Sequence, residues 1–375
     1  MSILCFNPGS GTLRYRLFDP RNGCRDIGGG MVDRIKGADA VRQAAENVLD
    51  ERDPERLEAV GVRVVHGGDE FIEPTRVDDQ TIEKLSQITH LAPLHLPTAI
   101  AVLQSVKQRI GCPVYAVFDT HFHRTMPEPQ RYFALPDGLR QKYRRYGFHG
   151  IAHQYVSQSF HHSPASVEHD GATDRVISLH FGGGASACAV HRGKSVATTM
   201  GMTPLDGLMM SSRCGSLDPA IVFQLLREGR DVDEVERLLN QDSGLKGVSG
   251  ISSDTRDILP ALQSGDPNAT LAIEMYAARV RESIGASIAT LGGCDAVLIS
   301  GALVKDSPQF RKHLLDQLDC FNIHLDPQAN DRSDELTIPT RLNRDGVTLA
   351  FIPAREELQM ARLLIQHGHF EGLGA

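Results

Sequence analysis

Two charged residues, Arg63 and Asp119, lie in strand-like segments where a charge is costly to bury. Arg63 stands among branched apolar residues, and Asp119 directly follows the apolar run 114–118. A buried charge is destabilising unless it is paired. The two residues therefore either form an internal ion pair or act on a ligand, with the carboxylate organising Mg²⁺ and the planar guanidinium binding phosphate. The segments alone leave both interpretations open.

Arg213 and Glu356 lie beside turns rather than inside strands. Arg213 belongs to a loop of small residues, 211–216, that leaves room for an anionic ligand. A loop arginine that is only solvated is the simpler alternative. Glu356 opens the last helical segment, where an acidic side chain interacts favourably with the helix dipole. The alternative is that Glu356 supplies a magnesium ligand at a domain junction.

His149 and His153 are four residues apart and would share one face if their segment is helical. A zinc site is disfavoured, because the glutamate of an H-E-x-x-H motif is missing. Hydrogen bonding or positive charge at a phosphate site is the favoured interpretation.

A strand–glycine turn–strand unit, which occurs twice, is the clearest scaffold for these residues. The first unit spans 3–18 around the turn 7–11, and the second spans 176–190 around the turn 182–184. In each, a short apolar run and a following strand are expected. Glycine lets backbone N–H groups approach an anion closely. Two such loops predict a clamp that holds one polyphosphate from two sides.

The order of elements indicates a duplicated α/β unit with a cleft between the copies. We expect strands over 59–65, 113–118, 185–190, 195–199, 295–300 and 348–352, and helices over 38–49, 80–111 (interrupted near Pro93 and Pro97), 219–227, 232–241, 269–291 and 355–366. The residues Gly28–Gly30 predict a turn, and the polar stretch 161–174 predicts a surface loop.

Size and composition narrow the class of protein. The 375 residues exceed what one core usually holds, so two domains are expected. A net charge of −8 argues against an electrostatic nucleic-acid binder. No apolar run is long enough to span a membrane. Seven scattered cysteines without a CxxC pair predict free thiols in the cytoplasm, and no leader-like segment opens the chain.

Taken together, these segments resemble the acetate kinase family of the acetate and sugar kinase/Hsp70/actin superfamily, nearly end to end. The matching segments are 7–14 (N-x-G-S-S-S-L-K in the family), 63–68 (R-V-V-H-G-G), 92–97 (A-P-L-H-N-P), 118–127 (F-D-T-A-F-H-x-T-M-P), 146–153 (Y-G-F-H-G-x-S-H), 200–208 (M-G-x-T-P-L-E-G-L) and 243–256.

The resemblance implies an actin-like, ribonuclease H-like fold of two duplicated α/β domains with an interdomain cleft. It implies an N-terminal acid-binding domain over 1–120 plus 358–375 and a C-terminal nucleotide-binding domain over 121–357. It also implies a cytoplasmic homodimer that uses Mg²⁺ (or Mn²⁺) and ATP, with no nucleic-acid or membrane partner.

The implied activity is reversible phosphoryl transfer from ATP to acetate, which gives acetyl phosphate and ADP. A carboxylate is already a nucleophile, so catalysis would consist of alignment and charge neutralisation. By resemblance, Arg63 and Arg213 bind the carboxylate and the phosphoryl group, and Asp119 organises magnesium or the nucleophile. Glu356 and Asn7 belong to the metal site, and Asn7, His149 and Arg213 stabilise the transition state.

The resemblance also implies two sets of binding residues. The apolar pocket for the acid's methyl group comprises Val65, Leu94, Phe148 and Pro204, with His95 beside it. The nucleotide side comprises Asn7, Arg14, His180, Gly182, Gly183, Gly184, Gly301, Ala302 and Val304.

Departures from the family pattern concentrate on the nucleotide side. Gly183 replaces the asparagine of the family's H-L-G-N-G loop. In 301–307, where the family has G-G-I-G-E-N-S, Ala302 and Val304 replace glycines and Lys305 replaces a glutamate. Added side chains would narrow a nucleotide pocket. The alternatives are therefore pyrophosphate or another nucleotide as donor, propionate or butyrate as acceptor, and a non-catalytic nucleotide clamp, which the retained charged residues disfavour.

Overall fold

A computed structural model describes residues 2–9, 11–35, 37–166, 174–331 and 336–367. Ser10 of the opening motif, part of the predicted loop 161–174 and the last residues of the predicted N-terminal domain lie outside these ranges. Backbone contacts group the chain into two compact units. Unit 1 comprises Met1–Arg124, Phe148–Tyr155 and Arg355–Ala375, and unit 2 comprises Thr125–Gly147 and Val156–Ala354. The domain limits drawn from the sequence stay a prediction.

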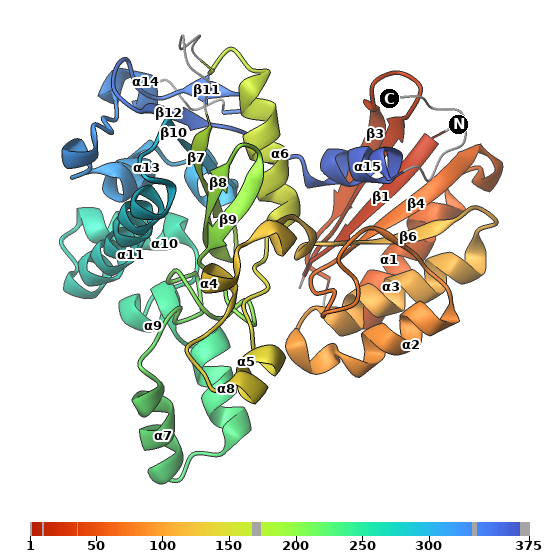
Figure 1. The fold of residues 1–375 in the computed structure, drawn as a ribbon, viewed down its shortest axis with the longest axis horizontal. Helices are drawn as coiled ribbons and strands as arrows, with labels where there is room; N and C mark the ends of the chain where they lie inside the picture. Colours follow the sequence, from red (N-terminus) through yellow and green to blue (C-terminus); the bar gives the residue numbers. More distant parts are fainter. Residues whose placement is uncertain (1, 10, 36, 167–173, 332–335, 368–375) are drawn as a thin grey trace. The chain divides into compact units, whose positions relative to one another are not determined.

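Unit 1 is built around a mixed sheet with helices on both faces (Figure 1). Its elements are β1 (Ser2–Pro8), β2 (Leu13–Asp19), β3 (Arg25–Val32), α1 (Ala38–Asp50), η1 (Pro54–Arg56), β4 (Leu57–Val64), β5 (Thr75–Arg76), α2 (Asp79–Gln87), η2 (Thr89–Leu91), α3 (Leu96–Arg109), β6 (Val114–Phe118), most of η3 (His121–Thr125), the first half of α6 (Gly150–His161) and α15 (Glu356–Gln366).

The strand order in this sheet is β3-β2-β1-β4-β6-β5. β1 pairs antiparallel with β2 and parallel with β4, and β4 pairs parallel with β6. Both β1 and β6 are buried along their whole length, as expected for the near-continuous apolar runs of central strands. The carboxyl ends of β1, β4 and β6 therefore lie at one edge of the sheet.

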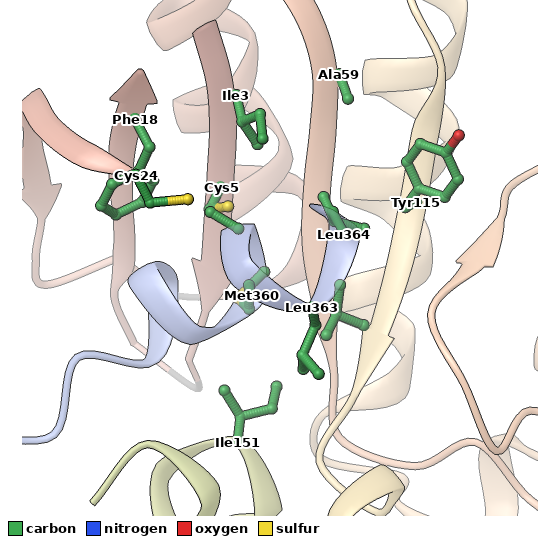
Figure 2. Packing of buried hydrophobic residues seen from close by; sticks show 12 residues of the cluster. Ile3, Cys5, Phe18, Cys24, Ala59, Tyr115, Ile151, Met360, Leu363 and Leu364 are labelled. Carbon is green, nitrogen blue, oxygen red and sulfur yellow. The ribbon is translucent and has the colours of Figure 1, made fainter. Parts of the chain in front are cut away.

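Helix α15, from the end of the chain, packs on the face of the sheet that carries Ile3 and Cys5 (Figure 2). Met360, Leu363 and Leu364 of α15 join these residues in one buried cluster. This packing is an apolar-face burial of the kind that stabilises most helices in proteins. It also places the first turn of α15 beside the end of β1.

Unit 2 contains the second sheet and most of the helices (Figure 1). Its elements are α4 (Glu128–Arg131), α5 (Asp137–Lys142), β7 (Arg175–Phe181), β8 (Ala185–His191), β9 (Lys194–Thr198), α7 (Pro219–Arg227), α8 (Val232–Gln241), α9 (Gly244–Ser249), α10 (Thr255–Gln263), α11 (Pro267–Leu291), β10 (Ala296–Ser300), α12 (Ala302–Lys305), α13 (Pro308–Leu315), η4 (Asp319–Phe321), α14 (Pro327–Asp331), β11 (Thr340–Arg341) and β12 (Thr348–Phe351).

The two sheets share one topology, which confirms the predicted duplication of an α/β unit. In unit 2 the order is β11-β12-β10-β7-β8-β9. β7 pairs antiparallel with β8 and parallel with β10, as β1 does with β2 and β4. β10 pairs parallel with β12, as β4 does with β6. Both glycine turns connect the first antiparallel pair of their sheet, as predicted.

The turn expected at Gly28–Gly30 is wrong, because these residues lie inside β3. Gly29 pairs with Arg16 of β2 at a φ of 157°, and a Cβ there would come within 2.3 Å of the carbonyl oxygen of Tyr15. Glycine here permits close approach of the neighbouring strand rather than a reversal of the chain. No helix in the described part of the chain is long and apolar enough to cross a membrane.

Candidate active site

The first group of predicted site residues meets at the carboxyl ends of β4 and β6 in unit 1. The backbone N–H of Asp119 donates to the carbonyl of Val64 at 3.0 Å, which continues the parallel ladder. The Arg63 guanidinium and the Asp119 carboxylate then form a two-pronged ion pair, with Nε–Oδ1 at 2.8 Å and Nη2–Oδ2 at 2.5 Å. The internal ion pair, one of the two interpretations of these charges, is therefore present.

Asn7 links this pair to the first turn of α15. Nη1 of Arg63 donates to Oδ1 of Asn7 at 3.1 Å. Nδ2 of Asn7 donates to Oε2 of Glu356 at 3.1 Å and to Oε1 of Glu357 at 2.8 Å. These five residues, Asn7, Arg63, Asp119, Glu356 and Glu357, form one polar group that we call the carboxylate cluster. Glu357 is not among the site residues predicted from the sequence, where its position next to Glu356 was the signal that could have identified it.

The carboxylate cluster carries an excess of negative charge. Three carboxylates (−3) and one guanidinium (+1) sum to −2. Burial raises the pKa of Asp119, and Arg63 acts in the opposite direction. Burial also acts to lower the pKa of Arg63, but the nearby carboxylates, Asp119 foremost, raise it above its ordinary value. The remaining charge is of the size that a divalent cation neutralises.

Oxygen donors of this kind suit Mg²⁺. Among the described residues, however, no three His, Cys, Asp or Glu side chains gather closely enough to hold a metal ion by themselves. Magnesium usually keeps several waters and binds through one or two carboxylates plus substrate phosphates. The carboxylate cluster therefore fits a magnesium ion that binds together with a phosphate group.

Arg63 keeps hydrogen-bonding capacity for a ligand despite its ion pair. A guanidinium has about five N–H donors. Its hydrogen bonds within the cluster use one N–H each from Nε, Nη1 and Nη2, which leaves two N–H groups without a partner among the described residues. The side chain is 14% exposed. The ion pair therefore leaves the anion-binding role of Arg63 possible.

His149 lies directly beside Asp119 in a strained backbone conformation. Its backbone hydrogen-bonds to the Asp119 carboxylate, and its φ of 56° is unusual for a residue with a side chain. Such strain gathers at functional sites. Although α6 begins at Gly150, so that His149 immediately precedes the helix, the carbonyl of His149 accepts from the N–H of His153 at 2.9 Å. The centres of the two rings lie 6.5 Å apart, so His149 and His153 are neighbours at the start of α6, as expected.

Arg14 and three of the predicted acid-pocket residues also belong to unit 1 and differ in exposure. Arg14 lies opposite Asn7 in the β1–β2 register, on the same face of the sheet, and its side chain is exposed. Val65 and Phe148 are buried, at 6% and 1% exposure, whereas Leu94 is 45% exposed.

His95 and Pro204 complete the predicted acid pocket. His95 is half-buried at the start of α3 in unit 1, and Pro204 is half-buried in unit 2. The pocket itself stays a prediction.

The segment 200–216 of unit 2, which we call the Arg213 loop, carries the second predicted arginine. Nη1 of Arg213 donates to the carbonyl of Pro204 at 3.2 Å and lies 3.7 Å from Sδ of Met210. No carboxylate pairs with Arg213 among the described residues. Burial lowers the pKa of this guanidinium from its ordinary value. A half-buried cation without a carboxylate partner among the described residues is what an anion-binding site requires.

The second glycine turn and the segment 301–307 meet at the carboxyl ends of the neighbouring parallel strands β7 and β10. A nitrogen of the His180 ring, Nδ1, lies 3.0 Å from Oγ of Ser300. A Cβ on Gly301, whose φ is 99°, would lie 2.2 Å from the carbonyl oxygen of Phe181. The structure thus brings His180, the glycines 182–184 and Gly301 to one edge, where open α/β sheets bind ligands.

The replaced residues of this edge differ in what they could contact. Ala302 is exposed, whereas Val304 is fully buried. Arg311, itself fully buried, donates to the carbonyls of Val304 and Lys305, the latter at 2.9 Å, and to Oδ1 of Asn330 at 2.7 Å. Arg311 therefore fixes α12, a role that no sequence pattern indicated. Of the two side chains that replace family glycines, that of Ala302 is exposed and that of Val304 is buried.

Comparison with known proteins decides the family. A model of the acetokinase family matches residues 40–362. The chain belongs to the acetokinase family. The acetate kinase of Halothermothrix orenii is 38% identical over 398 aligned residues, which cover 96% of this chain and 98% of that protein.

Solved structures of acetokinase relatives share the fold. A propionate kinase from Francisella tularensis matches with a TM-score of 0.86 at 30% identity, over 96% of this chain and 98% of that one. The acetate kinase of Entamoeba histolytica matches with a TM-score of 0.85 at 28% identity, over 99% of this chain and 100% of that one. The resemblance stated from the sequence is thereby confirmed.

Proposed function

We propose that this chain transfers the γ-phosphoryl group of ATP to acetate, reversibly, giving acetyl phosphate and ADP. The family supports this activity, and the acetate kinases among the relatives are named for it. The observation that carries the proposal is Arg213, a half-buried guanidinium with no carboxylate partner among the described residues. A bound phosphoryl group or carboxylate would supply the missing negative charge.

The proposed chemistry needs no general base. A carboxylate oxygen of acetate forms a bond to the γ-phosphorus while the bond from that phosphorus to the bridging oxygen of ADP breaks. Negative charge spreads over the equatorial oxygens, where Arg213 and the free N–H donors of Arg63 act. Asn7 and His149 would assist, and Asp119 would hold Arg63 in place or orient the nucleophile.

A divalent cation, Mg²⁺ or Mn²⁺, would neutralise phosphate charge during the transfer. Glu356 and Asn7 are the proposed residues toward this ion, with Asp119 in support. The net charge of −2 in the carboxylate cluster suits this use.

The acceptor and donor pockets are proposed from the same resemblance. Val65, Leu94, Phe148 and Pro204 would enclose the methyl group of acetate, with His95 beside them. Arg14, His180, the glycines 182–184, Gly301 and Ala302 would line the donor site, together with the backbone of Val304.

Two alternatives concern the substrates. The propionate kinase of Francisella tularensis keeps a longer acid, propionate or butyrate, open as acceptor. The exposed Ala302 and the cation of Lys305, both in α12, are the observations that support pyrophosphate or another nucleotide as the alternative donor. A non-catalytic nucleotide clamp is the remaining alternative.

We also propose a cytoplasmic homodimer with an acid-binding domain over 1–120 plus 358–375 and a nucleotide-binding domain over 121–357. Helix α7 supports self-association, because none of its residues is buried although it is largely apolar. Its Phe223 is 56% exposed and its Ile221 45% exposed. Free cysteines are consistent with a reducing compartment.

An acyl-hydroxamate assay tests the activity directly. It would cross acetate, propionate and butyrate with ATP, GTP and pyrophosphate, each with and without Mg²⁺. The proposal predicts the highest rate for acetate with ATP and no rate without metal. Absence of turnover for every pair, together with tight ATP binding in calorimetry, would instead identify a clamp.

A further inference from the structure

The guanidinium of Arg145, in unit 2, lies close to oxygen atoms from residues 198–200 and from Asp206, which are the two ends of the segment 198–206. Its Nη1 lies 3.3, 2.8 and 3.0 Å from the carbonyl oxygens of Thr198, Thr199 and Met200. The same nitrogen lies 3.3 Å from Oδ2 of Asp206. One guanidinium thus joins the end of β9 to a carboxylate several residues further on and closes the intervening chain into a loop.

Arg145 is itself held in place on several sides. Its backbone N–H donates to the carbonyl of Arg131 at 2.7 Å, and its guanidinium lies 5.2 Å from the centre of the Phe133 ring. The next residue, Tyr146, donates its N–H to the carbonyl of Gly201 at 3.0 Å. The Arg145 side chain and the backbone N–H of Tyr146 therefore both bind the segment 198–206.

Asp206 connects Arg145 to Ser216, at the far end of the Arg213 loop. While its Oδ2 faces Arg145, its Oδ1 accepts from Oγ of Ser216 at 2.7 Å and from the N–H of Gly207 at 2.8 Å. The packing around this carboxylate is tight, since a Cβ on Gly201 would lie 2.5 Å from Oδ2 of Asp206. A displacement of Asp206 would therefore also displace neighbouring residues of the Arg213 loop.

The Arg213 side chain is hydrogen-bonded to the segment 198–206, whose two ends contact Arg145. Its hydrogen bond goes to the carbonyl of Pro204, which lies between Met200 and Asp206 and so inside the closed loop. Arg213 also lies three positions before Ser216, the partner of Asp206. No carboxylate among the described residues pairs with the Arg213 guanidinium, whose contacts are the Pro204 carbonyl and Sδ of Met210, both within residues 200–216.

We propose that Arg145 is a positioning residue for phosphoryl transfer, which fixes Arg213 by closing the loop at residues 198–206. The inference rests on the proposed function. Lysine would not replace Arg145, because a single ammonium neither stacks on Phe133 nor offers a planar array of donors. Small displacements of a catalytic group cost roughly 10²-fold in rate.

A double-mutant cycle tests the coupling. Arg145→Ala should lower kcat roughly 10²-fold, and Arg145→Lys should recover only part of the loss. In an Arg213→Lys background, Arg145→Ala should cause little further loss, because the group that it positions has already been changed. Arg140→Ala is the matched control, since Arg140 pairs with the exposed Asp137 and should leave kcat unchanged.

Wild-type kcat in Arg145→Ala, or an equal loss in both backgrounds, would overturn the inference. Hydrogen exchange gives a second readout that does not depend on activity. The peptide covering 198–216 should exchange faster in Arg145→Ala than in wild type, and the peptides of unit 1 should not. Unchanged exchange in 198–216 would also contradict the inference, whereas an inactive wild type would contradict only the proposed function.

Discussion

The guanidinium of Arg63 and the carboxylate of Asp119 face each other across two hydrogen bonds, of 2.8 and 2.5 Å, at the ends of adjacent parallel strands. Asp119 is fully buried, and Arg63 is 14% exposed. Removing one member of such a pair leaves an uncompensated buried charge. The pair is therefore part of the stability of unit 1 as well as a proposed part of its chemistry.

Asp119→Ala should lower the free energy of unfolding by about 3–5 kcal/mol, because Arg63 would stay buried without its carboxylate. Urea unfolding measures this loss. Asp137→Ala, which removes the exposed partner of Arg140, should change the unfolding free energy by less than about 0.5 kcal/mol. Equal unfolding midpoints for the two variants would contradict this account.

The two residues that stand in place of family glycines in the segment 301–307, Ala302 and Val304, differ in burial. Val304→Gly should destabilise the protein by about 2–4 kcal/mol, because it empties a fully buried site and adds a helical glycine. Ala302→Gly, at an exposed position, should cost at most about 1 kcal/mol. Thermal unfolding of both variants gives the comparison, and greater damage from Ala302→Gly would be the contrary outcome.

Buried His123 should make stability depend on pH. Burial lowers its pKa to about 4, and its Nε2 lies 3.0 Å from the carbonyl oxygen of Phe148. Because the folded pKa is below the unfolded value of about 6.5, the neutral ring stabilises the fold above that pH, and this stability is lost as the pH falls toward 4. The loss from this ring between pH 7 and 5 should be about 2 kcal/mol.

His123→Asn removes the titrating ring and keeps a donor for the Phe148 carbonyl. Its unfolding free energy should change less between pH 7 and 5 than that of wild type. His162→Asn, at an exposed histidine, should retain the wild-type pH dependence. The same pH dependence in all three proteins would refute the role of His123.

The exposed face of α7 should carry the proposed self-association. Phe223→Glu places a charge on that face and should raise the dimer dissociation constant at least roughly 30-fold. Ile338→Glu changes an apolar side chain that is 63% exposed elsewhere in unit 2, and it should leave the dimer intact. Sedimentation velocity over a concentration series distinguishes the two. Unaltered association of Phe223→Glu would place the interface elsewhere.

The sequence was sufficient for the architecture, because two strand–glycine turn–strand units and their spacing carry the duplicated topology. It was less informative where the outcome depends on tertiary contact. Arg63 and Asp119 left the ion pair and the ligand site open, since strand ends reveal proximity but not pairing. Arg145 gave no signal, because its acceptors lie more than 50 positions away along the chain.

Glycine patterns show the same limit. Gly28–Gly30 is typical of a turn, yet these residues pair within β3, where glycine lets the neighbouring strand approach. The replacement of a glycine by Val304 suggested a narrowed pocket, yet the side chain is fully buried. In both cases composition identified the position, and packing decided its meaning.

Arg213 is proposed to bind the transferring phosphoryl group, and the substitution Arg213→Ala removes the guanidinium on which that role depends. The hydroxamate assay with acetate and ATP should show a loss of rate on the order of 10³-fold or more. The free energy of unfolding in urea should change by less than about 1 kcal/mol, because the partners of this guanidinium among the described residues are one carbonyl and one thioether. A variant as active as wild type, or one that loses activity only because it unfolds, would contradict the claim.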